Sequence, residues 1–522
     1  MKKTTIFCVV NLLGKPFILV VLFLLLSSLG TANAQVQPRE GLIRQQEQAS
    51  EALVRQHQQA RTGLINMHRD ARSRLDSLNQ RFAEDLARDW RSFDLTKSEP
   101  PIRTPILEPP VFDPETDVAP EPIRVPIART PQPPPAELQP RPVELPVITP
   151  TPTPIPLPPV QQVFRTTFFG TAITLPETPR PNIRLAGVSE REVADYWLAL
   201  SNLPYYTDWL DEALRLKSEL RLNDWGLFQL LNNLFSVYFP QGNENEQVVF
   251  SVFMLNQLGY RARIGRSANE LFALVAFRQM VFNTTFFTIG GTARYFVVNP
   301  NQRDLSSIRT TPINHGGAEL QIDMALPFMP RFAHNIRTRT LMGMPLQYNR
   351  NLVDFLATYP TVYFPIFAEA DICEVTWRSI EAHIAPQIRG MSQENAVNWL
   401  LNFVQRAFDY KTDQDNYGFE RWNFAEQTLA SRYSDCDDRS FLFAQLVRRL
   451  LNMPVVLVLY PDIHLATAVR FDNPNIRGDY LIINGQRYLI CDPTFIGARL
   501  GMAMPNLRHI PVQYFRVAPF RQ

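Results

Sequence analysis

The chain has 522 residues, which is enough for two or three domains, and 45% of them are hydrophobic, which is enough for a sizeable core. Its 52 basic residues nearly balance its 50 acidic residues, and the net charge is +2. We therefore expect no nucleic acid partner, because such partners select strongly basic surfaces.

The N-terminus has the pattern of a secretory signal. Two lysines precede an apolar run over residues 17–29, and Ala32 and Ala34 fit a small-residue cleavage site. Residues 1–34 are therefore predicted to be a signal peptide, which places the mature protein in the periplasm, in the cell envelope or outside the cell. The alternative is an uncleaved membrane anchor, although the run is short for a membrane span.

Removal of the signal leaves three cysteines: Cys373, Cys436 and Cys491. Three cysteines in a chain of this size do not form a disulfide framework, and an odd number leaves at least one thiol without an intramolecular partner. Cys373 and Cys491 could form a disulfide. This count favours one reactive cysteine.

Residues 35–99 are predicted to form an amphipathic helix. Apolar residues recur there at spacings of three, four and seven between Leu64 and Phe93. The stripe could bind a coiled-coil partner through residues 39–99 or dock on the protein itself. A solvated spacer helix is the alternative.

Residues 100–162 contain 22 of the 44 prolines. Proline excludes helix and central strand, so this segment is predicted to be an extended, protease-sensitive linker. We expect few contacts across it, and we expect the fragment 163–522 to fold alone.

The remaining sequence alternates helical and strand-like patterns in the same order twice, which predicts an α+β fold with domains at 163–325 and 326–522. The sequence YLIINGQRYLICD places Asn-Gly between two apolar stretches, a strong signal for a type I′ hairpin. The expected helices are SEREVADYWLAL, TDWLDEALRLKSEL, EQVVFSVFMLNQLG, SQENAVNWLLNFVQRAF and CDDRSFLFAQLVRRLL, and the expected strands are ELFALVAF, ARYFVVN, VVLVLY and HLATAVRF.

Three residues of the C-terminal domain fit a catalytic triad. Cys436 opens a predicted helix, His464 begins a predicted strand, and Asp492 ends another. A thiol needs a base to become a nucleophile at neutral pH, and the imidazole that serves as the base needs a third group to fix its tautomer. The helix N-terminus favours thiolate, whereas Asp437 and Asp438 would oppose it if they faced the sulfur. Arg439 or a protonated His464 would offset these carboxylates.

The segments SDCDDRSFLFAQLVRRLL, IHLATAV and RYLICDPTF resemble the three motifs of the transglutaminase-like superfamily. The resemblance covers about residues 391–500, is strongest toward exported members from Bacteroidetes, and departs from the common His-Ala-Trp type of strand. It implies a papain-like triad in which Cys436 is the nucleophile, His464 the general base and acid, and Asp492 the orienting group.

An oxyanion hole should combine the backbone N–H of Cys436 with one upstream donor. The resemblance implies a side-chain donor, for which Trp422, Gln427 and Tyr433 are candidates. Each of them could equally be a packed core residue.

The sequence of the first globular domain aligns with that of the second at one fixed shift of 193 residues, which places Leu258 on Leu451. This shift predicts a degenerate copy of the same transglutaminase-like unit. Asn243, Leu271 and Asn299 would then replace the cysteine, the histidine and the aspartate.

These patterns predict a thiol-dependent acyl-transfer enzyme that acts on a protein or peptide, as a cysteine peptidase, an amidase or a transglutaminase. The alternative is a non-catalytic envelope scaffold. No cofactor is expected, and no metal site is expected because His315, His334 and His383 lack ligands at the required spacing.

Overall fold

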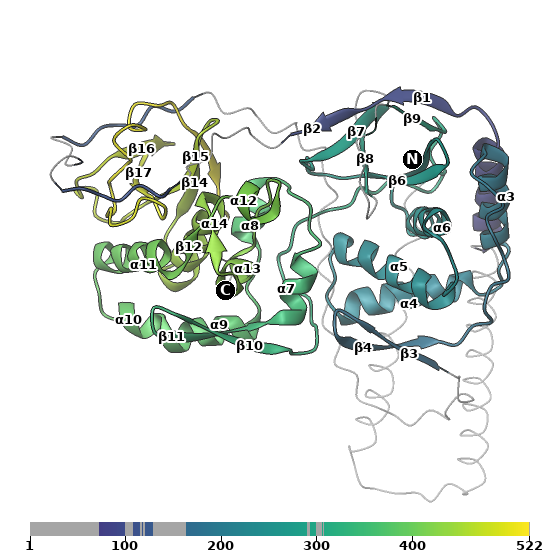
Figure 1. The fold of residues 1–522 in the computed structure, drawn as a ribbon, viewed down its shortest axis with the longest axis horizontal. Coiled ribbons are helices and arrows are strands. Elements are labelled where there is room, and N and C mark those ends of the chain that lie inside the picture. The colour runs from purple at the N-terminus through teal and green to yellow at the C-terminus, as the bar shows by residue number, and fades with distance from the viewer. Residues whose placement is uncertain are drawn as a thin grey trace, which may run out of the picture. The chain divides into compact units, whose positions relative to one another are not determined.

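The computed structural model describes residues 72–99, 108–114, 117, 121–128, 163–289, 293–298, 305 and 307–520. The predicted signal peptide and residues 35–71 lie outside this range. The described residues from Leu75 onward form one compact unit of mixed α+β structure (Figure 1), which confirms the predicted class. Among the described residues, no helix has both the length and the apolar character needed to cross a membrane.

The N-terminal part is built on a seven-stranded antiparallel sheet. In sheet order its strands are β1 (Arg91–Asp94), β9 (Ser307–Thr310), β5 (Ala262–Ser267), β6 (Glu270–Ala276), β8 (Ala293–Val297), β7 (Thr284–Ile289) and β2 (Thr96–Ser98). Its helices are α3 (Glu190–Ser201), α4 (Tyr206–Glu219), α5 (Asp224–Tyr238) and α6 (Glu244–Gln257), and the hairpin β3 (Val163–Phe168) and β4 (Thr171–Pro176) precedes them.

Residues 72–86 are helical, as expected, but the helix does not continue to residue 93. Within it Phe82 and Leu86 are buried, and the Phe82 ring lies 5.0 Å from that of Trp197 in α3. Phe93 belongs instead to β1. Since β1 and β2 complete the first sheet, this domain includes residues before 100 and does not begin at 163. The described part of the helix is thus a docking helix.

The C-terminal part contains a five-stranded antiparallel sheet against which α14 packs. In sheet order its strands are β16 (Tyr480–Ile483), β17 (Gln486–Cys491), β15 (His464–Val469), β14 (Val455–Tyr460) and β18 (Gln513–Arg516). The remaining elements are the hairpin β10 (Ile336–Leu341) and β11 (Met344–Asn349), the parallel pair β12 (Asp409–Tyr410) and β13 (Tyr433–Ser434), and the helices α7 (Arg350–Leu356), α8 (Phe364–Glu369), α9 (Glu374–His383), α10 (Ala385–Ile388), α11 (Gln393–Ala407), α12 (Asp413–Tyr417), α13 (Ala425–Ala430) and α14 (Cys436–Leu450).

The hairpin between β16 and β17 confirms the Asn-Gly prediction. Ile483 pairs with Gln486, which leaves a two-residue loop of Asn484 and Gly485. Both loop residues have positive φ, at 51° and 74°, as a type I′ turn requires. This turn fixes the register of β17 and thereby the position of Asp492 directly after it.

The two sheets share one strand order. Five strands of the first sheet run β9-β5-β6-β8-β7, and the second sheet runs β18-β14-β15-β17-β16. In each case a buried helix, α6 or α14, immediately precedes the two central strands. The predicted shift of 193 residues carries β5 (262–267) onto β14 (455–460). The arrangement therefore has the strand order that the predicted repeat requires.

The triad positions of the first domain are only partly as predicted. Leu271 lies in β6 and is buried. Asn243 is the N-cap of α6, whereas Cys436 is the first helical residue after its own cap, Asp435, so the helix starts differ by one residue. Asn299 lies outside the described residues.

Part of the proline-rich segment does not behave as a free linker. Residues 108–114 and 121–128 run along the C-terminal domain as a strap, defined here by those two ranges (Figure 1). Val125 donates to the Tyr480 carbonyl at 2.8 Å, and Phe112 donates to the Ile496 carbonyl at 2.7 Å. The Val125 side chain is fully buried. Proline is compatible with such edge pairing, because only alternate N–H groups must donate.

Candidate functional site

Cys436 occupies the first position of α14, as the sequence predicts. The carboxylate of the capping residue Asp435 accepts the N–H of Asp437 at 3.2 Å, and this hydrogen bond caps the N-terminus of the helix. Cys436 is only 6% exposed. Its Sγ donates toward Oδ1 of Asp437 at 3.7 Å.

His464 and Asp492 form a buried pair on neighbouring strands. His464 begins β15, and Asp492 directly follows β17, which pairs with β15. The His464 Nε2 and Asp492 Oδ2 atoms lie 2.9 Å apart, so the expected contact between these side chains is confirmed. The other carboxylate oxygen accepts the backbone N–H groups of Thr494 and Phe495. The carboxylate is therefore held from two sides.

The second ring nitrogen of His464, Nδ1, is buried and has no hydrogen-bond partner among the described residues. The expected hydrogen bond between the thiol and the imidazole is therefore absent, because the thiol is turned toward Asp437. The cysteine-bearing helix nevertheless packs on the histidine-bearing strand, and Ser440 Oγ donates to the Leu465 carbonyl at 3.0 Å. An unbonded Nδ1 and a carboxylate on Nε2 are what a general base for a thiol needs.

A cluster of carboxylates surrounds the N-terminus of α14. One oxygen from each of Asp413, Asp435 and Asp438 lies within 4.8 Å of the others, and all three residues are buried. Burial and the neighbouring Asp438 and Glu420 charges raise the pKa of Asp413 to about 10. Burial is also the main cause that raises the pKa of Asp438 to about 7 and holds the pKa of Asp435 well above its usual value.

These carboxylates are oxygen ligands of the kind that hard cations such as Ca²⁺ and Mg²⁺ prefer. Asp413, Glu420 and Asp437 form a second group of the same size around the same helix end. The raised pKa values of Asp413 and Asp435 favour protonated carboxyl groups at neutral pH, and protons compete with a cation for such oxygens.

The positive charge expected to offset the acids is present as Arg439, which is fully buried. Its guanidinium donates to Ser434 Oγ at 3.0 Å and to the Phe408 carbonyl at 2.9 Å, and it lies 5.2 Å from the Tyr410 ring centroid. Burial lowers its pKa, while the charges of Tyr410 and Asp435 act in the opposite direction. Arg439 thus contributes a cation beside the cluster without neutralising any one carboxylate in an ion pair.

We expect Asp438→Asn to flatten the dependence of stability on pH. The folded state holds the Asp438 proton up to a pKa of about 7, whereas the ordinary value is 3.8, so the stability of the native protein falls as the pH rises between these values. The amide cannot ionise, and at about 1.4 kcal/mol per pKa unit the difference should reach on the order of 4 kcal/mol at neutral pH. Urea unfolding at pH values across this window measures it. Asp462→Asn, at an exposed turn, is the control and should leave the slope unchanged.

The three oxyanion candidates make contacts with residues other than the thiol. Trp422 is buried, stacks on Phe364 at 4.2 Å and donates its Nε1–H to Glu420. Gln427 caps α13 by accepting the Phe424 N–H at 3.0 Å. The Tyr433 ring lies 5.0 Å from the Lys411 ammonium. Core packing thus accounts for Trp422, helix capping for Gln427, and contacts with the cations of Lys411 and Arg432 for Tyr433.

Tyr410 is a residue that the sequence pattern did not single out. It pairs with Ser434 in the short parallel ladder of β12 and β13, which sets it beside the start of α14. Burial raises the pKa of Tyr410, and the charges of Cys436 and Asp435 contribute to the shift, so the hydroxyl of Tyr410 stays protonated at neutral pH. Only the two-residue strand pairing brings it there, and so short a pairing has no periodic signal in the sequence.

Gln405 is the second residue that the sequence pattern did not single out. Its buried amide Nε2 donates to the carbonyls of Asp492 at 3.1 Å and Ala498 at 3.0 Å, and its Oε1 accepts the N–H of Gly497 at 3.0 Å. One side chain of α11 therefore holds both ends of the loop that follows the candidate orienting carboxylate. A polar residue on the buried face of a predicted amphipathic helix was the available signal.

We expect Gln405→Leu to destabilise the protein by about 2–3 kcal/mol, because it leaves two buried carbonyls and one N–H without partners. The loss should lower any activity of the site, because the loop that carries Asp492 is no longer held. Chemical unfolding provides the measurement. Arg406→Leu, at the exposed next position, should change stability by less than about 0.5 kcal/mol.

Comparison with known proteins provides no match: no family model, no curated protein and no solved structure matches the chain. The resemblance to the transglutaminase-like superfamily therefore stays a prediction from the motifs.

Proposed function

We propose that the chain is an exported, thiol-dependent acyl-transfer enzyme with a transglutaminase-like fold. In this proposal Cys436 is the nucleophile, His464 the general base and acid, and Asp492 the orienting group. The observation that supports it most is the buried hydrogen bond between His464 Nε2 and Asp492 Oδ2, with Nδ1 left unbonded. A purely structural histidine at such depth would be expected to use both nitrogens.

The chemistry begins with rotation of the thiol from Asp437 toward His464 Nδ1. The imidazole takes the thiol proton, and the thiolate attacks the carbonyl carbon of an amide or ester. The resulting oxyanion is stabilised by the backbone N–H of Cys436 together with one further donor. Collapse breaks the bond to the leaving group, which takes the proton from the imidazolium and leaves an acyl-thioester. Water or an amine then releases the acyl group by the reverse proton path.

The carboxylate cluster has a consequence for this chemistry. Ionised Asp435 and Asp437 would raise the free energy of a neighbouring thiolate, whereas protonated carboxyls would not. The raised pKa of Asp435 keeps that group neutral and is thus compatible with a thiolate at Cys436. Hydrolysis of a protein or peptide amide needs less machinery than transfer to an amine, and we favour it.

The common strand order of the two sheets supports a duplicated unit. In the first copy, a leucine at position 271 fills the place predicted for the imidazole and is buried. A copy without a base or a thiol supplies packing support beside the second domain. A non-catalytic envelope scaffold is the second candidate, and the low exposure of Cys436 favours it.

Alkylation by iodoacetamide at neutral pH separates the two candidates. An enzyme should be alkylated at Cys436 much faster than at Cys373, whose pKa is raised to about 12 by burial and the Glu426 charge. Peptide mass mapping against time gives the three rates. Equal, slow rates for Cys436, Cys373 and Cys491 would favour the scaffold.

A further inference from the structure

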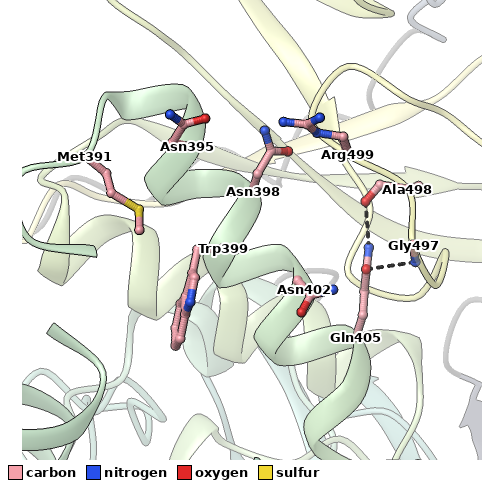
Figure 2. Close-up of a pocket in the computed structure, with 9 residues that line it drawn as sticks. All are labelled: Met391, Asn395, Asn398, Trp399, Asn402, Gln405, Gly497, Ala498 and Arg499. Atoms are coloured by element: carbon pink, nitrogen blue, oxygen red, sulfur yellow. Dashed lines mark hydrogen bonds between the residues drawn. The ribbon is translucent and has the colours of Figure 1, made fainter. Parts of the chain in front are cut away.

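A groove of about 500 Å³ lies on the outer side of α11, between that helix and the loop 497–499 (Figure 2). Its volume falls within the range of about 300–1,000 Å³ that is usual for small-ligand sites. Asn395, Asn398, Trp399 and Asn402 line it from one helix face, and Arg499 lines it from the loop. None of the candidate triad residues lines this groove.

The loop wall of the groove is fixed by hydrogen bonds from α11. Gln405 holds the backbone of Gly497 and Ala498, as described above, and Asn398 Oδ1 accepts the N–H of Leu500 at 2.9 Å. The Trp399 ring stacks on Phe403 with centroids 5.8 Å apart and planes within 5°. Helix, loop and aromatic ring are therefore preorganised, which lowers the entropic cost of binding a ligand.

The lining offers donors and no negative charge. The Oδ1 atom of Asn398 accepts the backbone N–H of Leu500, so the Nδ2 group of Asn398 is left to donate to a ligand. Arg499 is the only charged side chain among the lining residues, and it is exposed. A guanidinium in this position binds a carboxylate well, because its paired N–H groups match two carboxylate oxygens.

We propose that this groove binds an acidic saccharide. The sugar carboxylate would lie on Arg499, its hydroxyls would meet the carboxamides of Asn395, Asn398 and Asn402, and its apolar C–H face would cover Trp399. A peptide ending in a carboxylate shares the charge. However, peptides are usually held by backbone pairing along a strand edge or by an apolar helix groove, and their terminal carboxylates are usually captured by backbone N–H groups. This groove is lined by one helix and one loop, and its side chains are carboxamides.

Isothermal titration calorimetry of the full chain with trigalacturonic acid tests the proposal, with galactotriose as the neutral comparison. We expect the acidic trisaccharide to bind and the neutral one to bind at least tenfold more weakly. Arg499→Gln should weaken acidic binding at least tenfold. Asn398→Asp should do the same, because it keeps the acceptor for Leu500 but turns a donor into a negative charge. Arg406→Gln, on the same helix outside the lining, should bind as the native chain does.

The proposal is overturned if neither saccharide binds, if both bind equally, or if Arg499→Gln binds like Arg406→Gln. A short peptide with a free C-terminal carboxylate is the third ligand. If the peptide binds in an Arg499-dependent way and trigalacturonic acid does not, the ligand class is wrong. Binding is measured without turnover, so these outcomes are independent of the chemistry proposed for Cys436.

Discussion

Cys436→Ala is expected to abolish acyl transfer, and His464→Gln is expected to reduce it by at least about 10³-fold, as loss of a triad member does in other thiol and serine enzymes. The alanine removes the only atom that can form the acyl-thioester. The glutamine amide can still donate to Asp492 Oδ2, so the carboxylate keeps a partner. It cannot carry a proton from sulfur to the leaving group. Ammonia release from a glutamine-containing peptide and p-nitrophenol release from an ester measure the two losses.

Cys373→Ser is the matched control for these variants. The serine hydroxyl can replace the thiol that donates to Glu426 Oε1, so neither the fold nor the site should change. Cys436→Ala should cost no more than about 1 kcal/mol of stability, because a small side chain is shortened by one atom. A large fall in the unfolding midpoint of Cys436→Ala, with activity unchanged in His464→Gln, would show that the cysteine is a packing residue and the catalytic proposal wrong.

The elements that carry the candidate site were predictable because their sequences combine a regular spacing of apolar residues with residues that mark helix starts and turns. In α14, apolar residues recur at helical spacing after a cluster of acids, and those acids suit a helix N-terminus. The Asn-Gly pair fixed the β16–β17 hairpin and its register. Strand pairing then placed Asp492 beside His464, although 28 residues separate them in the chain.

The contributions of Gln405, Tyr410 and the carboxylate cluster were not predictable in the same way. Each depends on which side chains meet across elements distant in sequence. Asp413 lies in α12, and its carboxylate meets Asp435 and Asp438 only through the packing around α14. A single sequence specifies the charge of such residues but not the burial that raises their pKa values.

The docked strap was also missed, and for a physical reason. A proline-rich composition excludes regular sheet and helix, and it was interpreted as a free spacer. It does not exclude single bridges to a sheet edge or to a loop, where one N–H donates and the next residue can be proline. Val125 lies between prolines at 122 and 126, and its N–H donates to the Tyr480 carbonyl beside the bridge between Arg124 and Tyr480.

Val125→Asp should therefore destabilise the protein by about 3 kcal/mol or more, since a carboxylate would replace a side chain that is fully buried among the core residues of the second sheet. Val111→Asp is the matched control on the same strap. Val111 is 67% exposed, so its replacement should cost less than about 0.5 kcal/mol. Urea unfolding of both full-length variants gives the difference directly. A free linker would make the two variants equal in stability, whereas a docked strap makes only Val125→Asp destabilising.

The same reasoning reverses the expectation that a fragment starting at residue 163 folds alone. That fragment lacks the strap, β1, β2 and the docking helix that covers Trp197.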